Sequence, residues 1–218
     1  LPLVENLMQN KIEDYLFSLG VENAKEKCIL LEKYVDELML FNPTLKLVGS
    51  KERDDIILRH IFDSVAAYPI FKRETKCDMN IADLGSGAGL PGLVLAILFE
   101  DRNFFLIERM QRRVGFLRST IALLKLRNVS VIDKDIKEAK GSFDYLTCRA
   151  FHPIVDIASD AIKLSKNAIF YKGTEANIGA EIASLKKQGY KFVSVIEPIT
   201  VPGLSEMRNI VILKDWER

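Results

Sequence analysis

The glycine-rich segment after residue 84 constrains the fold of this chain more than any other feature. Residues 80–84 form an apolar run with one acid, Asp83, and four of the eight residues that follow are glycines. Glycine has no Cβ, so it can adopt positive φ and let a ligand lie against the backbone. An apolar helical pattern begins directly afterwards. A strand, a glycine loop and a helix in this order predict a nucleotide-sized cradle at the N-terminus of the helix.

The acid ahead of the loop helps to decide which nucleotide would bind. Residues 87–92 formally match G-x-G-x-x-G, which alone is a weak indication of a dinucleotide site. In such a site the helix N-terminus takes a pyrophosphate, and a preceding acid would repel it. S-adenosyl-L-methionine instead carries a sulfonium and an ammonium group, which a carboxylate would attract. Asp83, two residues before Gly85, therefore favours S-adenosyl-L-methionine as the cofactor.

A second acid also indicates a nucleotide site. Residues 103–107 predict a buried strand, and Glu108 follows at its carboxyl end. A carboxylate there can accept hydrogen bonds from both ribose hydroxyls, but dinucleotide folds carry an acid at this point too. A solvated charge that caps a helix start is the alternative. The position directly after an apolar strand favours the ribose role for Glu108.

The rest of the chain alternates between strand and helix patterns. Alternating βαβ units predict a parallel sheet with helices on both faces. Residues 198–207 are too few for a crossover, so the last two strands are expected to pair antiparallel. The predicted elements are strand 79–84, helix 91–100, strand 103–107, helix 110–126, strand 129–133, strand 143–149, helix 153–165, strand 167–172, helix 175–188, strand 191–197 and strand 208–214.

The first part of the chain predicts helices. Gly20 indicates a break between two of them, and the second is expected to end at Asn42-Pro43, because the residue before proline avoids the α region. A further helix is expected over 51–70. We therefore expect an N-terminal helical extension at 1–70 that packs on the core, and an α/β domain at 71–218.

Composition limits the functional classes. No apolar run approaches the roughly 20 residues that span a bilayer, and no secretory signal is visible, so we expect a cytoplasmic protein without membrane contact. Three widely spaced cysteines show no metal-binding pattern, so no metal is expected. Net charge is only +1, yet residues 109–127 hold six basic residues and no acid, which predicts one basic face. Nothing argues against a monomer.

Several segments together resemble one family. Residues 83–92 resemble the glycine loop of the RsmG (GidB) family of bacterial small-subunit rRNA guanine-N7 methyltransferases. Residues 59–64, 112–118, 148–151, 171–173 and 208–212 resemble further segments of that family, in the same order, so the resemblance spans roughly 40 to 214. The departures, each mild in size or chemistry, are Ser86, Ala88, Glu108 and Cys148.

The resemblance implies a class I S-adenosylmethionine-dependent methyltransferase, with a Rossmann-like, mostly parallel seven-stranded sheet and an antiparallel last strand. It implies methylation of N7 of a guanine in 16S rRNA, with ribosomal RNA or the small ribosomal subunit as partner. It also implies backbone contacts to adenine at Ile136 and Lys137, whereas Asp135 could accept from the adenine amino group. An ordinary polar turn remains the alternative for these three residues. The expected cofactor-binding residues are Asp83, Gly85, Gly87, Gly89, Leu90, Glu108, Asp135, Ile136, Lys137 and Arg149.

Guanine N7 has an exposed lone pair, so the reaction needs no general base, and no residue is expected to be catalytic except by positioning. Arg149 ends an apolar strand, where an isolated charge is costly. It is expected to contact the cofactor carboxylate or RNA phosphate, and a structural ion pair with Asp83 or Glu108 is the alternative. His60 is the second positioning candidate. The expected RNA contacts are Arg112, Arg113, Arg118, Lys172 and Arg208. The aromatic rings of Tyr145, Phe151 or Tyr171 could stack on an unstacked base of the RNA.

Three other functions remain open at this point. The first is a methyltransferase that acts on a small molecule or a protein, which the small net charge favours and the basic helix disfavours. The second is a dinucleotide-dependent oxidoreductase, which Asp83 disfavours. The third is a regulatory module that binds a nucleotide without chemistry.

Overall fold

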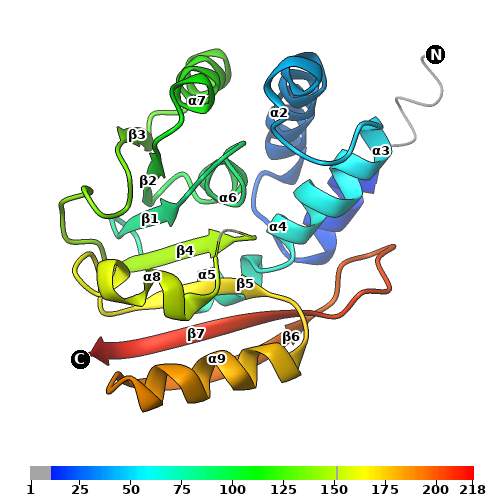
Figure 1. Ribbon diagram of the computed structural model, residues 1–218. Helices are drawn as coiled ribbons and strands as arrows, with labels where there is room; N and C mark the ends of the chain where they lie inside the picture. Colours follow the sequence, from blue (N-terminus) through cyan, green and yellow to red (C-terminus); the bar gives the residue numbers. More distant parts are fainter. Residues whose placement is uncertain (1–10, 151) are drawn as a thin grey trace.

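Seven strands form one sheet in the order β3-β2-β1-β4-β5-β7-β6 in a computed structural model that describes residues 11–150 and 152–218 (Figure 1). β7 pairs antiparallel with both β5 and β6, and the other neighbours are parallel. The mostly parallel sheet and the antiparallel final pair are confirmed, and β7 additionally lies between β5 and β6. The strands are β1 Asn80–Leu84, β2 Asn103–Glu108, β3 Val129–Asp133, β4 Tyr145–Arg149, β5 Ala168–Lys172, β6 Lys191–Ile199 and β7 Arg208–Glu217.

Helices cover both faces of the sheet, as the alternating pattern predicts. Successive strand residues point to opposite faces, so Ile81 packs in one hydrophobic cluster and Ala82 in another. The first cluster includes buried side chains of α6 (Gly92–Leu98) and α7 (Gln111–Leu124). The second includes those of α8 (Ile154–Ala161) and α9 (Glu175–Lys187). The carboxyl ends of the parallel strands therefore open between two helical layers.

The N-terminal helices differ from the prediction in two places. Residues 11–18 are helical, and α2 (Ala24–Leu45) continues past the expected end at Asn42-Pro43. Proline removes its own N–H from the helix and crowds the carbonyl four residues earlier, and here it lies in the last turn of α2. The Asn42 side chain anchors the next loop by accepting from Val48 N at 2.9 Å and donating to Ser50 O at 2.7 Å. The expected helix 51–70 is divided into α3 (Arg53–Ile56), a π-helical turn η1 (Ile57–Phe62), α4 (Asp63–Val65) and the start of α5 (Tyr68–Glu74).

These helices and one face of the sheet share a single hydrophobic core. Buried Tyr34 of α2 also donates a hydrogen bond from its hydroxyl to the carbonyl oxygen of Ala88, at 2.7 Å, so α2 holds the glycine loop directly. The division near residue 70 stays a prediction.

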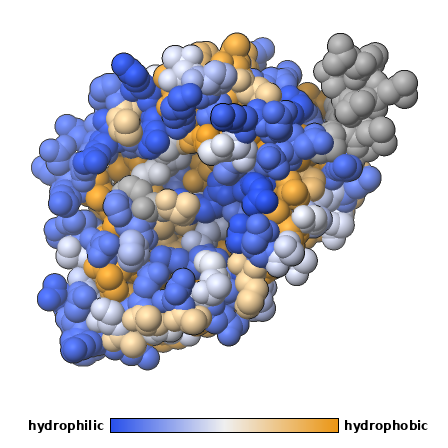
Figure 2. Space-filling model, turned by 45° about the vertical axis from the view of Figure 1, so that its right-hand side comes forward, coloured by the Kyte–Doolittle hydropathy of each residue, from blue (hydrophilic) through white to orange (hydrophobic). Residues whose placement is uncertain are grey.

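The surface shown in Figure 2 is hydrophilic over most of its area and is hollowed near its middle. Within 11–150 and 152–218, no helix has both the length and the apolar character needed to cross a bilayer.

Two glycines provide a matched test of the packing at the end of β1. A Cβ on Gly92 would meet the side chain of Leu106 and lie 2.7 Å from Asp83 Oδ2, whereas a Cβ on Gly115 of α7 would meet nothing within 4 Å. We expect Gly92→Ala to lower the free energy of unfolding by about 1–3 kcal/mol through overpacking. Gly115→Ala should raise it by about 0.5–1 kcal/mol, because alanine is the better helix former. Urea unfolding measures both, and equal effects of the two substitutions would contradict the packing described.

Candidate active site

The loop after β1 is a tight turn built on glycine backbone conformations. Gly85, Gly87 and Gly89 all have positive φ, at 65°, 57° and 93°. Gly89 N donates to the carbonyl of Ser86 at 2.7 Å, which closes the turn. A Cβ on Gly89 would lie 2.5 Å from Leu93 Cδ1, whereas one on Gly87 would have no atom nearer than 3.8 Å. Gly89 is therefore needed for packing, whereas a Cβ on Gly87 would make only ordinary van der Waals contacts, with Gly85 O and Arg113 Nη1.

Asp83 is fully buried at the end of β1. Its Oδ2 accepts a hydrogen bond from Gly92 N at 3.1 Å, while its Oδ1 has no hydrogen-bond partner. Burial raises the pKa of this carboxyl to about 7, and the bond from Gly92 and the charge of Arg149 act in the opposite direction. A buried carboxylate with one unpaired oxygen is stabilised by a nearby cation. The electrostatics would thus suit a positively charged ligand group, and the cofactor contact expected of Asp83 stays a prediction.

Glu108 joins the glycine loop to the start of α7. The carboxylate is 5% exposed, accepts from Gly87 N at 2.9 Å through Oε2 and accepts from Met110 N at 2.8 Å through Oε1. The helix-start contact is thus present. Each carboxylate oxygen can accept more than one hydrogen bond, so the expected ribose contact remains geometrically open.

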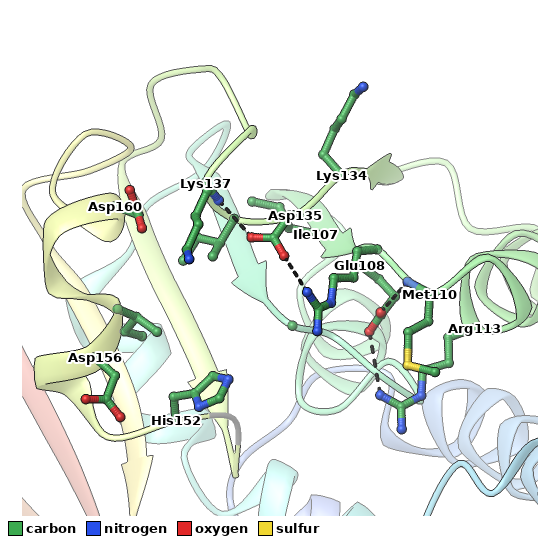
Figure 3. Close-up of a pocket in the computed structure, with 14 residues that line it drawn as sticks. Ile107, Glu108, Met110, Arg113, Lys134, Asp135, Lys137, His152, Asp156 and Asp160 are labelled. Carbon is green, nitrogen blue, oxygen red and sulfur yellow. Dashed lines mark hydrogen bonds and ion pairs between the residues drawn. The ribbon is translucent and has the colours of Figure 1, made fainter.

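A cavity of about 400 Å³ lies between the ends of β1, β2 and β3 and the helix α8 (Figure 3). We call it the donor cavity, after the expected methyl donor S-adenosyl-L-methionine. Asp156 and Asp160 of α8 stand on one side of it, and Glu108 and Arg113 stand on the other. Five of the expected cofactor residues line it: Gly85, Glu108, Asp135, Ile136 and Lys137. The other five expected residues, Asp83, Gly87, Gly89, Leu90 and Arg149, do not line this cavity, and Leu90 packs in the hydrophobic core.

The sequence reasoning missed an ion pair that crosses part of this cavity. Arg109 Nη1 donates to Asp135 Oδ2 at 2.9 Å, and Lys137 N donates to Asp135 Oδ1 at 3.1 Å. The backbone bond from Lys137 is the main cause of the lowered pKa of Asp135. Arg109 and Asp135 come just after the adjacent parallel strands β2 and β3, so their side chains lie at the same edge of the sheet. This placement in the sequence could have predicted the ion pair. His152, Asp156 and Asp160 were also missed as lining residues.

A second cavity of about 570 Å³ adjoins the donor cavity, since His152 lines both. We call it the arginine cavity. Arg149 and Arg208 line it, and Asp63 pairs with both of them, with Arg149 Nη1 at 2.6 Å from Oδ2 and Arg208 Nε at 3.0 Å from Oδ1. The alternative partners expected for Arg149, Asp83 and Glu108, are therefore wrong. Asp63 lies 86 residues away in sequence, and no local pattern indicates that pairing.

His60 supports Arg149 in its neutral form. Its Nδ1 is 3.1 Å from Arg149 Nη2, and its Nε2 is 3.2 Å from Ser50 Oγ. Because arginine can only donate, Nδ1 accepts and Nε2 carries the proton. Burial, followed by the charge of Arg149, lowers the pKa of His60 to about 4. This contact agrees with the expected positioning role of His60.

The residues expected to bind RNA occupy different environments. Arg112 is exposed on α7, but Arg113 lines the donor cavity with Nη1 3.9 Å from Glu108 Oε2. Lys172 Nζ pairs with Glu181 Oε2 at 2.9 Å. Arg118 Nη2 lies 3.7 Å from Asp133 Oδ2 on the surface. Of the stacking candidates, Tyr145 and Tyr171 are buried, and Phe151 lies outside the described residues.

The fold defines a class I methyltransferase, a class that uses S-adenosylmethionine. Two solved structures share the fold at low sequence identity. The delta-N METTL16 MTase domain has a TM-score of 0.59 at 11% identity, over 85% of this chain and 97% of that one. The tRNA (m1A58) methyltransferase TrmI from Aquifex aeolicus has a TM-score of 0.52 at 14% identity, over 71% of this chain and 69% of that one.

Sequence comparison identifies the family. The model of the GidB family, described as rRNA small subunit methyltransferase G, matches residues 27–211. The ribosomal RNA small subunit methyltransferase G of Treponema denticola is 34% identical over 91% of each chain. Its counterpart in Borrelia hermsii is 36% identical over 82% of this chain and 87% of that one. The chain belongs to the rRNA small subunit methyltransferase G family, and the resemblance seen in the sequence is confirmed.

The half-buried, neutral His60 predicts a pH dependence of stability. The unfolded chain binds a proton at His60 below about pH 6.5, but the folded protein binds it only below about pH 4. Unfolding is therefore favoured progressively as pH falls from 6.5 to 4, by roughly 3 kcal/mol in total. We expect His60→Asn, which keeps an acceptor for Arg149, to lack this loss. Urea unfolding of both proteins at several pH values tests this, and a constant stability difference between them would contradict it. Taking the difference removes the opposite contribution of Asp83, whose raised pKa favours folding as pH falls.

Proposed function

We propose that this chain transfers a methyl group from S-adenosyl-L-methionine to N7 of a guanine in 16S ribosomal RNA. The observation that carries the proposal is the pair of adjoining cavities at the carboxyl edge of the sheet. One is lined by Gly85 of the glycine loop and by acids suited to the donor, and the other contains arginines suited to a nucleic-acid acceptor. Family membership supports the same substrate class. We further infer that the protein acts as a monomer in the cytoplasm, where its ribosomal substrate is found.

The donor cavity fits S-adenosyl-L-methionine in size and chemistry. Its volume of about 400 Å³ lies within the usual range for small-ligand sites. Gly85 lines the cavity, and Asp135, Asp156 and Asp160 place carboxylates on its wall, which favour a cation nearby. Glu108 is in place to accept from ribose hydroxyls. When bound, the donor supplies an electrophilic methyl group on its sulfonium.

The protein's contribution to the reaction would be binding and alignment. Guanine N7 is already a nucleophile, so rate enhancement depends on holding it in line with the methyl group and on electrostatic preorganisation. Arg149 is suited to this because Asp63, His60 and the Arg59 carbonyl fix its guanidinium. Its position in the arginine cavity supports contact with the acceptor strand rather than with the carboxylate of the donor.

The basic helix α7 divides between the two substrates. Arg112 is exposed and available to RNA phosphate, which contributes affinity and register. Arg113 faces the donor cavity beside Glu108, where a positive charge stabilises the buried carboxylate. Neighbouring arginines thus have separate roles, although the sequence predicted RNA contacts for both.

Single charge reversals test this division. Arg112→Glu should weaken binding of rRNA roughly tenfold and reduce the dependence of log Kd on log salt by about 1, with unchanged donor affinity. Arg113→Glu places two carboxylates together and should weaken donor binding roughly tenfold or more. Calorimetry measures the donor, and filter binding measures the RNA. The division fails if either reversal reduces both affinities equally.

The function itself is tested by transfer of labelled methyl from S-adenosyl-L-methionine to small ribosomal subunits that lack the modification. Digestion to nucleosides should place the label in 7-methylguanosine. Heat-denatured protein and fully modified subunits are the matched controls, and neither should incorporate label.

Label in another nucleoside would reject the N7 assignment and keep the donor and the RNA class. Donor binding without label in RNA would favour a small-molecule or protein substrate, or a module that binds nucleotide without chemistry.

A further inference from the structure

Asp63 is the centre of a buried polar cluster at the wall of the arginine cavity. Its side chain is 6% exposed, and both carboxylate oxygens are used, one by Arg149 and one by Arg208. These arginines come from β4 and β7, which are not neighbours in the sheet. A single carboxylate therefore fixes two guanidinium groups that the sheet alone would not hold together.

The backbone around Asp63 also connects the helical segment to the strands of the sheet. The π-helical turn Ile57–Phe62 precedes it, and such turns are rare and often occur at functional sites. Arg149 Nη1 also donates to the carbonyl oxygen of Arg59 in this turn, at 3.0 Å. The hydroxyl of Tyr171 on β5 donates to the carbonyl oxygen of Ser64 at 2.8 Å. The helical segment is thus tied to β4, β5 and β7 around the cavity.

The cluster carries a net positive charge and one hydrogen-bond donor that has no partner among the described residues. Two guanidinium groups share one carboxylate, so a net positive charge faces the cavity, and the other cations on its wall, Arg59 and Lys172, are paired with Glu206 and Glu181. Arg149 Nε is buried without a hydrogen-bond partner. A buried donor without a partner is costly, and an incoming acceptor would satisfy it once the guanidinium moves enough to expose this atom. Arginine forks match phosphate oxygens in geometry.

We propose that Asp63 is a positioning residue for the acceptor strand, and that it holds Arg149 and Arg208 so that they grip an RNA phosphate beside the methylated base. The inference rests on the proposed function, because it requires RNA in the arginine cavity. Asp63 touches neither donor nor acceptor and acts through the two arginines.

The direction in which RNA affinity changes when Asp63 is removed distinguishes a positioning role from a general electrostatic effect. Removing an acid from an RNA-binding surface makes that surface more positive, and by charge alone RNA would bind more tightly. If Asp63 positions the arginines, its loss instead weakens RNA binding, because two misplaced donors no longer meet the phosphate.

The test compares Asp63→Asn with Asp54→Asn, an identical change at an exposed acid of the same helical segment. We expect Asp63→Asn to raise KM for small ribosomal subunits about tenfold or more, with little change in kcat and in calorimetric Kd for S-adenosyl-L-methionine. The salt dependence of RNA binding should fall as well. Asp54→Asn should leave KM unchanged or slightly lower it.

A double-mutant cycle adds a readout that a structural role would not produce. Arg208→Gln should raise KM as Asp63→Asn does, and combining the two should give much less than the product of the separate effects. If Asp63→Asn does not fold, Arg208→Lys keeps the charge but removes the fork, and it should still raise KM.

Unchanged or tighter subunit binding in Asp63→Asn, independent effects in the cycle, or a normal KM for Arg208→Lys would each overturn the inference. Failure of the unsubstituted protein to methylate any subunit would overturn the proposed function instead, so the two failures are distinguishable.

Discussion

The buried carboxylate of Asp83 is the constraint on which the site depends. It ends β1 and accepts from Gly92 N, so the first turn of α6 is fixed against the strand, and the glycine loop must close between these two points. Gly92 permits this approach because a Cβ would collide with Asp83. The other carboxylate oxygen has no partner, which is costly in a buried group and agrees with a pKa raised to about 7. Unsatisfied charge of this kind is concentrated at functional sites, because a ligand of opposite charge can compensate it.

The N-terminal helices belong to the site as much as the sheet does. Tyr34 of α2 holds the glycine loop through Ala88, and the segment 53–65 supplies Asp63 and His60 to the arginine cavity. The sheet contributes Arg149 and Arg208, but contacts from the helical segment orient their guanidinium groups. The donor cavity is lined mainly by the ends of strands, whereas the arginine cavity exists only where helices and sheet meet.

The parts of the structure that the sequence predicted are those that depend on local pattern. Strand periodicity, the short connection before β7 and the glycines at positive φ are all encoded within a few residues, and each is confirmed. The partner of Arg149 was missed because the ion pair joins segments 86 residues apart. The continuation of α2 through Pro43 was missed because the preference of the residue before proline is a tendency that a helix can override, and α2 does so for its last residues. The different environments of Arg112 and Arg113 could not be predicted from the sequence, because they depend on how α7 is rotated on the sheet.

The two ends of the donor cavity differ in rigidity, and the difference suits a nucleoside that must enter and leave. At the end formed by β1 and β2, Gly85 and Glu108 line the cavity, and the Glu108 carboxylate is buried and accepts two backbone hydrogen bonds, so its orientation is fixed. At the β3 end, Asp135 pairs with Arg109, whose side chain is 73% exposed. An exposed ion pair contributes little, about 0–1 kcal/mol, so an adenine amino group could displace the guanidinium at small cost. The bond from Lys137 N would still orient the Asp135 carboxylate. Recognition of adenine through Asp135 is therefore compatible with the observed pairing, and the ordered end of the cavity rather than this end would determine where the methyl group lies.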